Sequence, residues 1–193
     1  WVGTTNGLVK LTRDHGRTWT DVSIPNTAYP TRAIVETIEA SPFDSTTAYA
    51  VVDLIAAGDY APRIYRTRDF GAHWESITNG LPTDQPSGSF VHVVRADPKR
   101  AGLLFAGTES GMFVSFNDGD AWQSLELNMP RVPCRDVVFA GNDLLVGTFG
   151  RGIWVLDDYT VLRQMTNEVT HEAAHLFTPA PAVRVRRNVG YDT

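Results

Sequence analysis

The chain has 193 residues, a 42% hydrophobic content and a formal net charge of −5. This length and content suffice for a domain with a hydrophobic core, and 16 glycines with 11 prolines favour a turn-rich all-β protein. The acidic balance excludes a general affinity for nucleic acid, because the one basic stretch, Arg184 to Arg187, alternates with valine like the exposed face of a strand. No hydrophobic run reaches transmembrane length, and the single cysteine, Cys134, forms no intrachain disulfide.

In chain order, the predicted strands repeat one plan. A strand, a Gly-Thr turn, a glycine and a second strand occur at residues 1–11, 105–114 and 145–156. Residues 48–52 and 63–67 follow the same plan with a longer connection over 53–62. An additional β-branched or apolar run precedes each later copy, at residues 33–40, 90–96 and 135–140. Units of four strands that recur every ~40 to 50 residues are typical of a β-propeller.

We therefore predict an all-β fold, a β-propeller of four-stranded antiparallel blades. The predicted boundaries are a partial blade over 1–28, blades over 29–83 and 84–130, a last blade over 131–158 and a C-terminal segment over 159–193. Since the first copy starts at the second strand of a blade, we expect further blades from sequence upstream of Trp1 or from another chain. About four blades lie near the lower limit for ring closure, which supports this expectation.

Three loops share the pattern Ser/Thr-x-Asp/Asn-x-Gly-x-x-Trp, and we call them the box loops. The pattern positions are Thr12, Asp14, Gly16 and Trp19, then Thr67, Asp69, Gly71 and Trp74, then Ser115, Asn117, Gly119 and Trp122. The Asp or Asn side chain suits hydrogen bonds to the backbone of its own turn, and glycine suits a positive φ. We expect each tryptophan to fold over its turn and bury its ring. The pattern thus predicts structural loops, and the last blade lacks one.

The pattern resembles the Asp-box, or BNR repeat, found in β-propellers of sialidases, xyloglucan-active glycoside hydrolases and sortilin-type receptors. The resemblance implies a structural loop between the third and fourth strands of a blade, away from the ligand-binding face. Residues 154–158 followed by Leu-Phe-x-Pro-x-Pro at 176–181 resemble bacterial sortilin-like or "glycosyl hydrolase"-labelled propeller proteins. That resemblance implies an exported protein, periplasmic, secreted or at the cell surface, whose tail leads to further domains.

The segment after the last blade loses strand alternation. Over residues 157–172 helical spacing of apolar residues predicts a short helix, followed by an extended segment over 182–187. His171 and His175 match the zinc-binding pattern His-Glu-x-x-His. Because Pro179 ends any helix soon afterwards and a third ligand is missing, we interpret the match as chance. We expect no metal and no cofactor.

Ligand chemistry is expected at the end of the propeller opposite the box loops, although fold alone does not supply function. Asp53 and Glu109 are the one carboxyl pair there that could serve a glycosidase. Candidate ligand-binding residues are Arg32, Asp59, Tyr60, His92, Arg135, Phe149 and Arg151. Of these, Arg32, Arg135 and Arg151 could imitate the arginine triad with which sialidases bind a carboxylate.

Three functions remain open. The first is a non-catalytic recognition or scaffold propeller of sortilin-like type that binds a protein or glycan partner. The second is a glycoside hydrolase whose acidic pair lies partly outside this chain. The third is a structural subunit of a larger assembly, in which neighbours cover the open blade edges.

Overall fold

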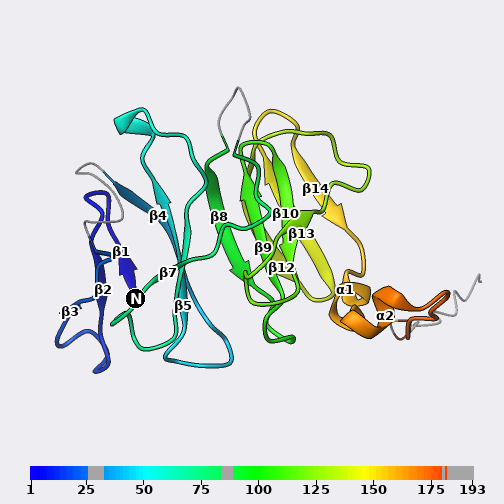
Figure 1. Ribbon diagram of the computed structural model, residues 1–193, viewed down its shortest axis with the longest axis horizontal. Helices are drawn as coiled ribbons and strands as arrows, with labels where there is room; N and C mark the ends of the chain where they lie inside the picture. Colours follow the sequence, from blue (N-terminus) through cyan, green and yellow to red (C-terminus); the bar gives the residue numbers. More distant parts are fainter. Residues whose placement is uncertain (26–32, 84–88, 180, 182–193) are drawn as a thin grey trace, which may run out of the picture.

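The computed structural model describes residues 1–25, 33–83, 89–179 and 181, and its described part is almost entirely β-structure. Four antiparallel sheets lie side by side along the long axis of the molecule (Figure 1). Each sheet is a meander in which consecutive strands pair, as in a propeller blade. The predicted all-β blade architecture is therefore confirmed.

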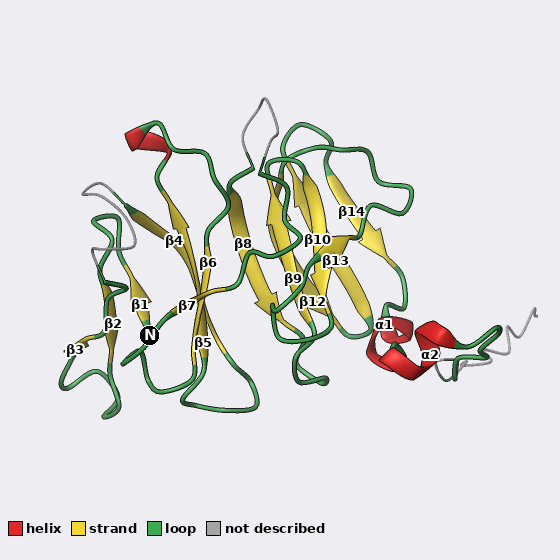
Figure 2. Ribbon diagram, viewed as in Figure 1, coloured by secondary structure: helices red, strands yellow, loops and turns green. Residues whose placement is uncertain are grey.

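We number the sheets as blades 1 to 4 (Figure 2). Blade 1 contains β1 (Val2–Gly3), β2 (Val9–Leu11) and β3 (Thr20–Asp21). Blade 2 contains β4 (Ile34–Ala40), β5 (Ala48–Asp53), β6 (Ile64–Thr67) and β7 (Glu75–Ser76), with a 3-10 helix η1 (Ile55–Ala57) after β5. Blade 3 contains β8 (Val91–Ala96), β9 (Leu104–Thr108), β10 (Gly111–Ser115) and β11 (Gln123–Ser124). Blade 4 contains β12 (Cys134–Ala140), β13 (Asp143–Thr148) and β14 (Ile153–Leu156).

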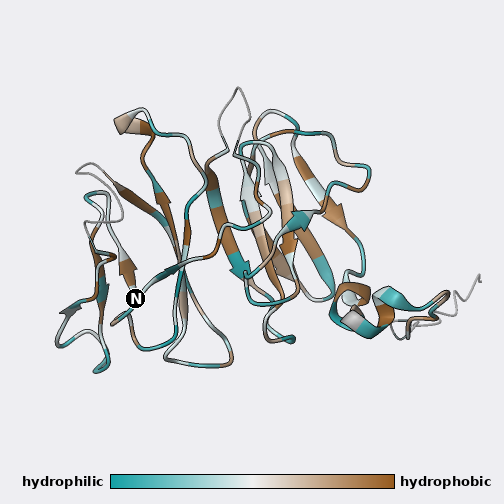
Figure 3. Ribbon diagram, viewed as in Figure 1, coloured by the Kyte–Doolittle hydropathy of each residue, from teal (hydrophilic) through white to brown (hydrophobic). Residues whose placement is uncertain are grey.

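The core consists of apolar layers between neighbouring sheets, and hydrophobic residues concentrate on the strands (Figure 3). Blades 2 and 3 enclose the layer that includes Val51, Ile64, Val94 and Phe113. Close approach is also needed, because a Cβ at Gly107 would lie 2.5 Å from the carbonyl oxygen of Cys134 on the next blade. The Gly-Thr turns of the sequence therefore contribute to blade packing as well as to chain reversal.

Each box loop satisfies its own polar groups. In the second loop the Thr67 hydroxyl donates to Asp69 Oδ1 (2.9 Å) and accepts from Gly71 N (2.9 Å). Asp69 Oδ1 also accepts from His73 N (2.9 Å). This backbone bond, followed by the bond to the His73 ring, lowers the pKa of Asp69 to about 2. The first and third loops repeat the pattern around Asp14 and Asn117.

The tryptophans of the second and third box loops also bond the preceding blade, a contact that the sequence does not indicate. Trp74 Nε1 donates to the carbonyl oxygen of Val22 in blade 1 (2.8 Å), and Trp122 Nε1 donates to that of Ile77 in blade 2 (2.7 Å). The indole N–H therefore joins each of these two rings to the preceding blade, and the expected burial is found for Trp122, which is 5% exposed. The physical reason is that the turn already satisfies its own polar groups, so the indole N–H finds an acceptor at the end of the neighbouring outer strand. Trp19 is 48% exposed on blade 1.

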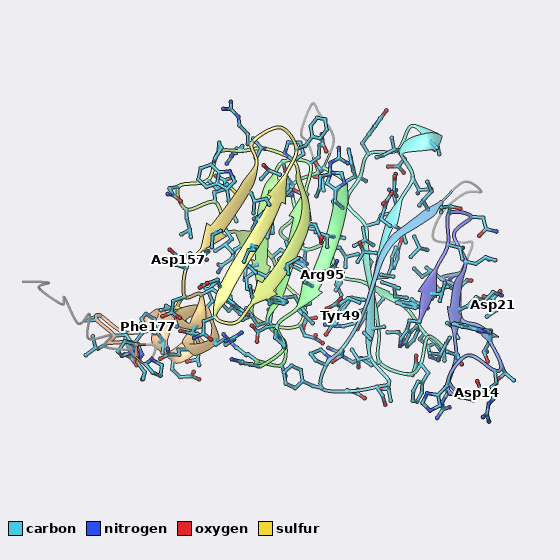
Figure 4. The ribbon with its side chains drawn as sticks, turned by 180° about the vertical axis from the view of Figure 1, so that it is seen from behind. Asp14, Asp21, Tyr49, Arg95, Asp157 and Phe177 are labelled. Carbon is cyan, nitrogen blue, oxygen red and sulfur yellow. The ribbon has the colours of Figure 1, made fainter. Side chains whose placement is uncertain are left out.

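Charged side chains also join the blades. Arg95 of β8, labelled in Figure 4, contacts Asp136 of blade 4 (3.0 Å) and Glu39 of blade 2 (3.6 Å). The guanidinium of Arg66, which is almost fully buried, donates to Asp118 and Asp120 of the third box loop. These ion pairs hold blade 2 against blade 3 and blade 3 against blade 4.

Two short helices follow blade 4 where one was predicted, α1 (Thr160–Gln164) and α2 (Asn167–His171). The break lies at Met165, which is extended, and at Thr166, whose hydroxyl caps α2 by accepting from Val169 N (3.4 Å). Arg163 of α1 forms an ion pair with the buried Asp97 of blade 3 (2.9 Å), which anchors the helix. The extended segment predicted over 182–187 lies outside the described residues. Within the described residues, no helix is long and apolar enough to cross a membrane.

Candidate ligand-binding site

The inner strands of blades 2, 3 and 4 each contain a β-bulge near their first residues. The register of β4 with β5 shifts between Val35 and Thr37, and those of β8 and β12 shift at the corresponding places. The extra residues at these three bulges are Glu36, His92 and Arg135. Because a bulge redirects the side chain of its extra residue, the same position on three successive blades carries an ionisable group out of the regular pleat.

A second set of equivalent residues lies at the end of the second strand of each blade: Asp53 is the last residue of β5, and Glu109 and Phe149 directly follow β9 and β13. Within each blade the bulge residue contacts this partner. His92 Nε2 lies 2.9 Å from Glu109 Oε2, and the Arg135 guanidinium lies 5.4 Å from the centre of the Phe149 ring. In blade 2, the Glu36 and Asp53 side chains share a hydrogen bond. We call these six residues the polar row.

The row continues from one blade to the next. Arg135 Nη1 of blade 4 lies 3.3 Å from His92 Nδ1 of blade 3, and Arg135 Nη2 lies 3.9 Å from Glu109 Oε2. Since arginine only donates, His92 accepts at Nδ1 and donates from Nε2 to Glu109, which describes a neutral imidazole. Burial lowers the pKa of His92, the bond to Glu109 opposes part of this shift and the charge of Arg135 adds to it. A neutral, oriented histidine therefore connects a carboxylate to a guanidinium.

Glu36 and Asp53 form a carboxyl pair at the other end of the row. Burial, and then the charge of Asp53, raise the pKa of Glu36. Asp53 is 8% exposed and also accepts a hydrogen bond from the backbone N–H of Ile55, at the start of η1. Glu36 therefore takes up a proton more readily than a free glutamate, because a neighbouring carboxylate disfavours its charged form.

Three aromatic side chains lie in or beside the polar row, and we call them the aromatic rim: Phe149, which belongs to the row, and Tyr60 and Phe90. Phe149 is 68% exposed and Tyr60 is 48% exposed. Phe90 is buried and meets the His92 ring edge-on, with ring centres 4.8 Å apart. Hydrogen-bonding groups beside exposed rings suit a ligand that combines polar contacts with stacking.

Most of the residues predicted for the ligand-binding end take part in this arrangement. His92, Glu109, Arg135 and Phe149 come together, while Asp53 pairs with Glu36 of its own blade, on which the charge of Arg135 acts. Asp59 pairs instead with Arg63 in its own loop. Arg151 is exposed at the turn before β14. Arg32 lies outside the described residues, so the proposed arginine triad stays a prediction.

Sequence reasoning missed Glu36, although a signal was present. Glu36 precedes His92 by the same number of residues as Asp53 precedes Glu109, so an alignment of blades 2 and 3 places it in the row. The row also lies at the end opposite the box loops. Figure 4 shows Asp14 of the first box loop at one end of the strands and the η1 loop at the other.

Other hollows and motifs fit a functional site less well. A cavity of about 600 Å³ lies at the box-loop end, between the third box loop and the segment that joins the helices. Its lining includes Arg100, which donates to the Leu162 carbonyl and stacks on Phe116, so this cation serves the anchoring of α1. In the His-Glu-x-x-His segment α2 ends at His171 and the next residue is extended, so the two histidines do not share a helical face. Within the described part of the chain no group of three or more potential metal ligands occurs.

Comparison with known proteins gives structural neighbours only. No family model matches the chain, and no curated protein matches it. YCF48 bound to a D1 peptide superposes with a TM-score of 0.56 at 16% identity, over 81% of this chain and 46% of that one. YCF48 from Cyanidioschyzon merolae gives 0.52 at 19% identity, over 80% and 48%. The GH74 xyloglucanase from Xanthomonas campestris gives 0.55 at 18% identity, over 76% and 23%.

The chain thus spans less than half the length of each of these neighbours. At such low identity the likeness concerns the fold alone. Sheet topology and neighbours agree on it: the chain has a β-propeller fold.

Proposed function

We propose that this chain is a non-catalytic recognition propeller that binds a protein or glycan partner through the polar row and its aromatic rim. The observation that carries the proposal is the use of one bulge position on three blades to present Glu36, His92 and Arg135. Among the contacting residues His92, Glu109 and Arg135, Arg135 is the most accessible: its side chain is 49% exposed, against 8% for His92 and 18% for Glu109. It therefore offers N–H donors to an incoming acceptor, beside the exposed face of Phe149.

The engagement of the carboxylates favours binding over hydrolysis. Glu109 holds the His92 ring, and Asp53 holds the N–H of Ile55 and the side chain of Glu36. A glycosidase needs one carboxyl group as acid and another as base or nucleophile, both facing the sugar. The structural neighbours include YCF48 with a bound D1 peptide and a GH74 xyloglucanase, so the experiment tests both peptides and glycans.

The test is a screen of the folded chain against a peptide array and a glycan array. We expect ligands whose binding is lost in Arg135→Ala and weakened in Phe149→Ala. Arg17→Ala is the matched control, since Arg17 is also exposed and lies in the first box loop, at the end opposite the row. Ligands that bind Arg135→Ala and the unmodified chain equally would refute the assignment of the row.

Hydrolysis of a glycan is the competing function. Its candidate carboxyl pair is Asp53 and Glu109, which lie at equivalent positions of adjacent blades. If the chain releases oligosaccharides from xyloglucan, and Asp53→Asn or Glu109→Gln stops the release while the fold survives, then the recognition proposal is wrong. Circular dichroism and the denaturation midpoint report whether each variant is folded.

We also propose that the outer faces of blades 1 and 4 meet further blades, of this chain or another, in an exported protein. Exposed hydrophobic residues support the contacts with further blades: Trp19 on blade 1 and Val138, Ile153 and Val155 on blade 4. Light scattering of the chain, and fractionation of cells that make the whole protein, test the assembly and the location.

A further inference from the structure

A repeated tryptophan socket recurs between blades 3 and 4, where this chain has no fourth box loop to fill it. Between blades 1 and 2 the socket holds Trp74, and between blades 2 and 3 it holds Trp122. In each case the indole N–H donates to the residue that follows the outer strand of the preceding blade. The next place in this series is a small apolar hollow lined by Leu125, Leu127, Met129, Leu144, Val146 and Trp154, which we call the third socket.

Backbone geometry establishes the equivalence of the three sockets. Val22 N donates to Val9 O (3.0 Å), and Ile77 N donates to Ile64 O (2.9 Å). Leu125 N donates to Met112 O (2.9 Å) in the same manner. The Leu125 carbonyl therefore occupies the place of the two carbonyls that accept an indole N–H.

The strand beside the third socket has an open edge. In blades 2 and 3 the third strand pairs with the short outer strands β7 and β11. Among the described residues, β14 pairs with β13 alone. Ile153 and Val155 of β14 are 72% and 52% exposed. An unpaired edge beside an apolar socket is a template for an added strand.

We propose that an extended segment of a partner polypeptide pairs with β14 and inserts a tryptophan into the third socket, with its indole N–H on the Leu125 carbonyl. The surface continues the line of two interfaces already formed within the molecule, and these interfaces define the chemistry of the occupant. This inference is argued from the tryptophan contacts between the blades and from the edge of β14, and it is independent of the polar row.

Two details define how the segment enters. A Cβ at Gly80 would lie 2.2 Å from Trp122 O, and the corresponding residue beside the third socket is Asn128. Because Asn128 carries a Cβ, we expect the incoming backbone to stay farther from blade 3 than Trp122 O lies from Gly80; in blade 1 the equivalent residue is Pro25, which also carries a Cβ. The hollow has a volume of about 50 Å³, so Leu127, which is 71% exposed, must turn outward to admit an indole.

The test uses a dye-labelled peptide with the chain's own sequence over residues 119–126, titrated with the folded chain and followed by fluorescence anisotropy. We expect saturable binding, and a loss of about tenfold or more when the peptide carries Trp122→Ala, because a buried aromatic anchor dominates such contacts. In the chain, Met129→Asp should abolish binding, since it places a carboxylate in the socket. Leu127→Asn should strengthen binding, since it opens the rim. Leu176→Asp, at a residue that is 96% exposed on the C-terminal segment, is the matched control and should have no effect.

Equal binding of the two peptides, or no saturable binding to the unmodified chain, would overturn the proposal even if Met129→Asp failed to fold. The same titration is repeated with a longer form of the protein. Peptide binding by this chain but not by the longer form would also overturn the proposal. That result would assign the socket to an intramolecular strand.

Discussion

Replacing Trp122 by alanine tests how the blades hold together. Trp122 is 5% exposed, its ring belongs to the apolar layer between blades 2 and 3, and its N–H bonds the Ile77 carbonyl at 2.7 Å. Loss of a buried tryptophan side chain costs about 3–5 kcal/mol. The orphaned carbonyl accounts for about 1 kcal/mol or more of such a loss.

This loss is large against the stability of a single domain, which is about 5–15 kcal/mol. For a chain of this size each kcal/mol lowers the melting temperature by about 2–4 °C, so we expect a fall of about 6–20 °C. The internal control is Trp19→Ala, at the same position of the first box loop, where the ring is 48% exposed. Its cost should stay near or below about 1 kcal/mol.

The assay is urea denaturation of both variants, followed by far-ultraviolet circular dichroism, with thermal melts in parallel. The reasoning is that the neighbouring blade, and not the turn, supplies the stabilisation. Equal destabilisation by Trp122→Ala and Trp19→Ala would therefore refute it, because both residues occupy the same place relative to their own turns.

Three further predictions use the same contrasts. Gly119→Ala should destabilise the fold by about 2–4 kcal/mol, because it places a Cβ 2.4 Å from Ile77 Cδ1 at a φ of +90°. At Gly16, where φ is +87°, an added Cβ meets only the Trp19 ring at 3.9 Å, so Gly16→Ala should cost about 1–2 kcal/mol in the same denaturation assay. Arg163→Ala should cost about 3–5 kcal/mol, since it leaves the fully buried Asp97 carboxylate without its cation; a neutral effect on the denaturation midpoint would contradict the anchoring of α1. Because the pKa of Asp69 is about 2 in the folded chain and 3.8 ordinarily, its contribution to stability is present above about pH 4 and lost as the pH falls toward 2. Asp69→Asn should therefore flatten the decline of the denaturation midpoint between about pH 4 and about pH 2, as Asn117 already does in the third loop, and an unchanged acid profile would count against this assignment.

The strand plan was predictable because each blade repeats the same local signals. Apolar alternation and Gly-Thr turns are properties of a few neighbouring residues, and four copies of them reinforce one another. The bond from each tryptophan to the preceding blade was not predicted, for the opposite reason. The acceptor of the Trp122 N–H lies on another blade, and no local pattern names Ile77 as that acceptor.

The polar row was predictable in part. Three of its residues, Asp53, Glu109 and Phe149, lie at the ends of strands that the sequence indicates clearly. Glu36 was missed because a bulge changes which side chains share a face after it, and alternation alone does not locate a bulge. Alignment of the blades supplies this information, since equivalent residues pass through equivalent bulges.

The site and the blade packing depend on one another at a single close contact. Gly107 of β9 approaches the Cys134 carbonyl so closely that a Cβ would lie 2.5 Å away, and Arg135 is the next residue. The position of the Arg135 guanidinium relative to His92 and Glu109 is therefore set by how closely β12 packs on blade 3. A contact of 3.3 Å between residues of two sheets requires that these sheets keep a fixed spacing. The sockets and ion pairs between the blades supply this rigidity, so box loops at one end of the molecule support a recognition surface at the other without touching it.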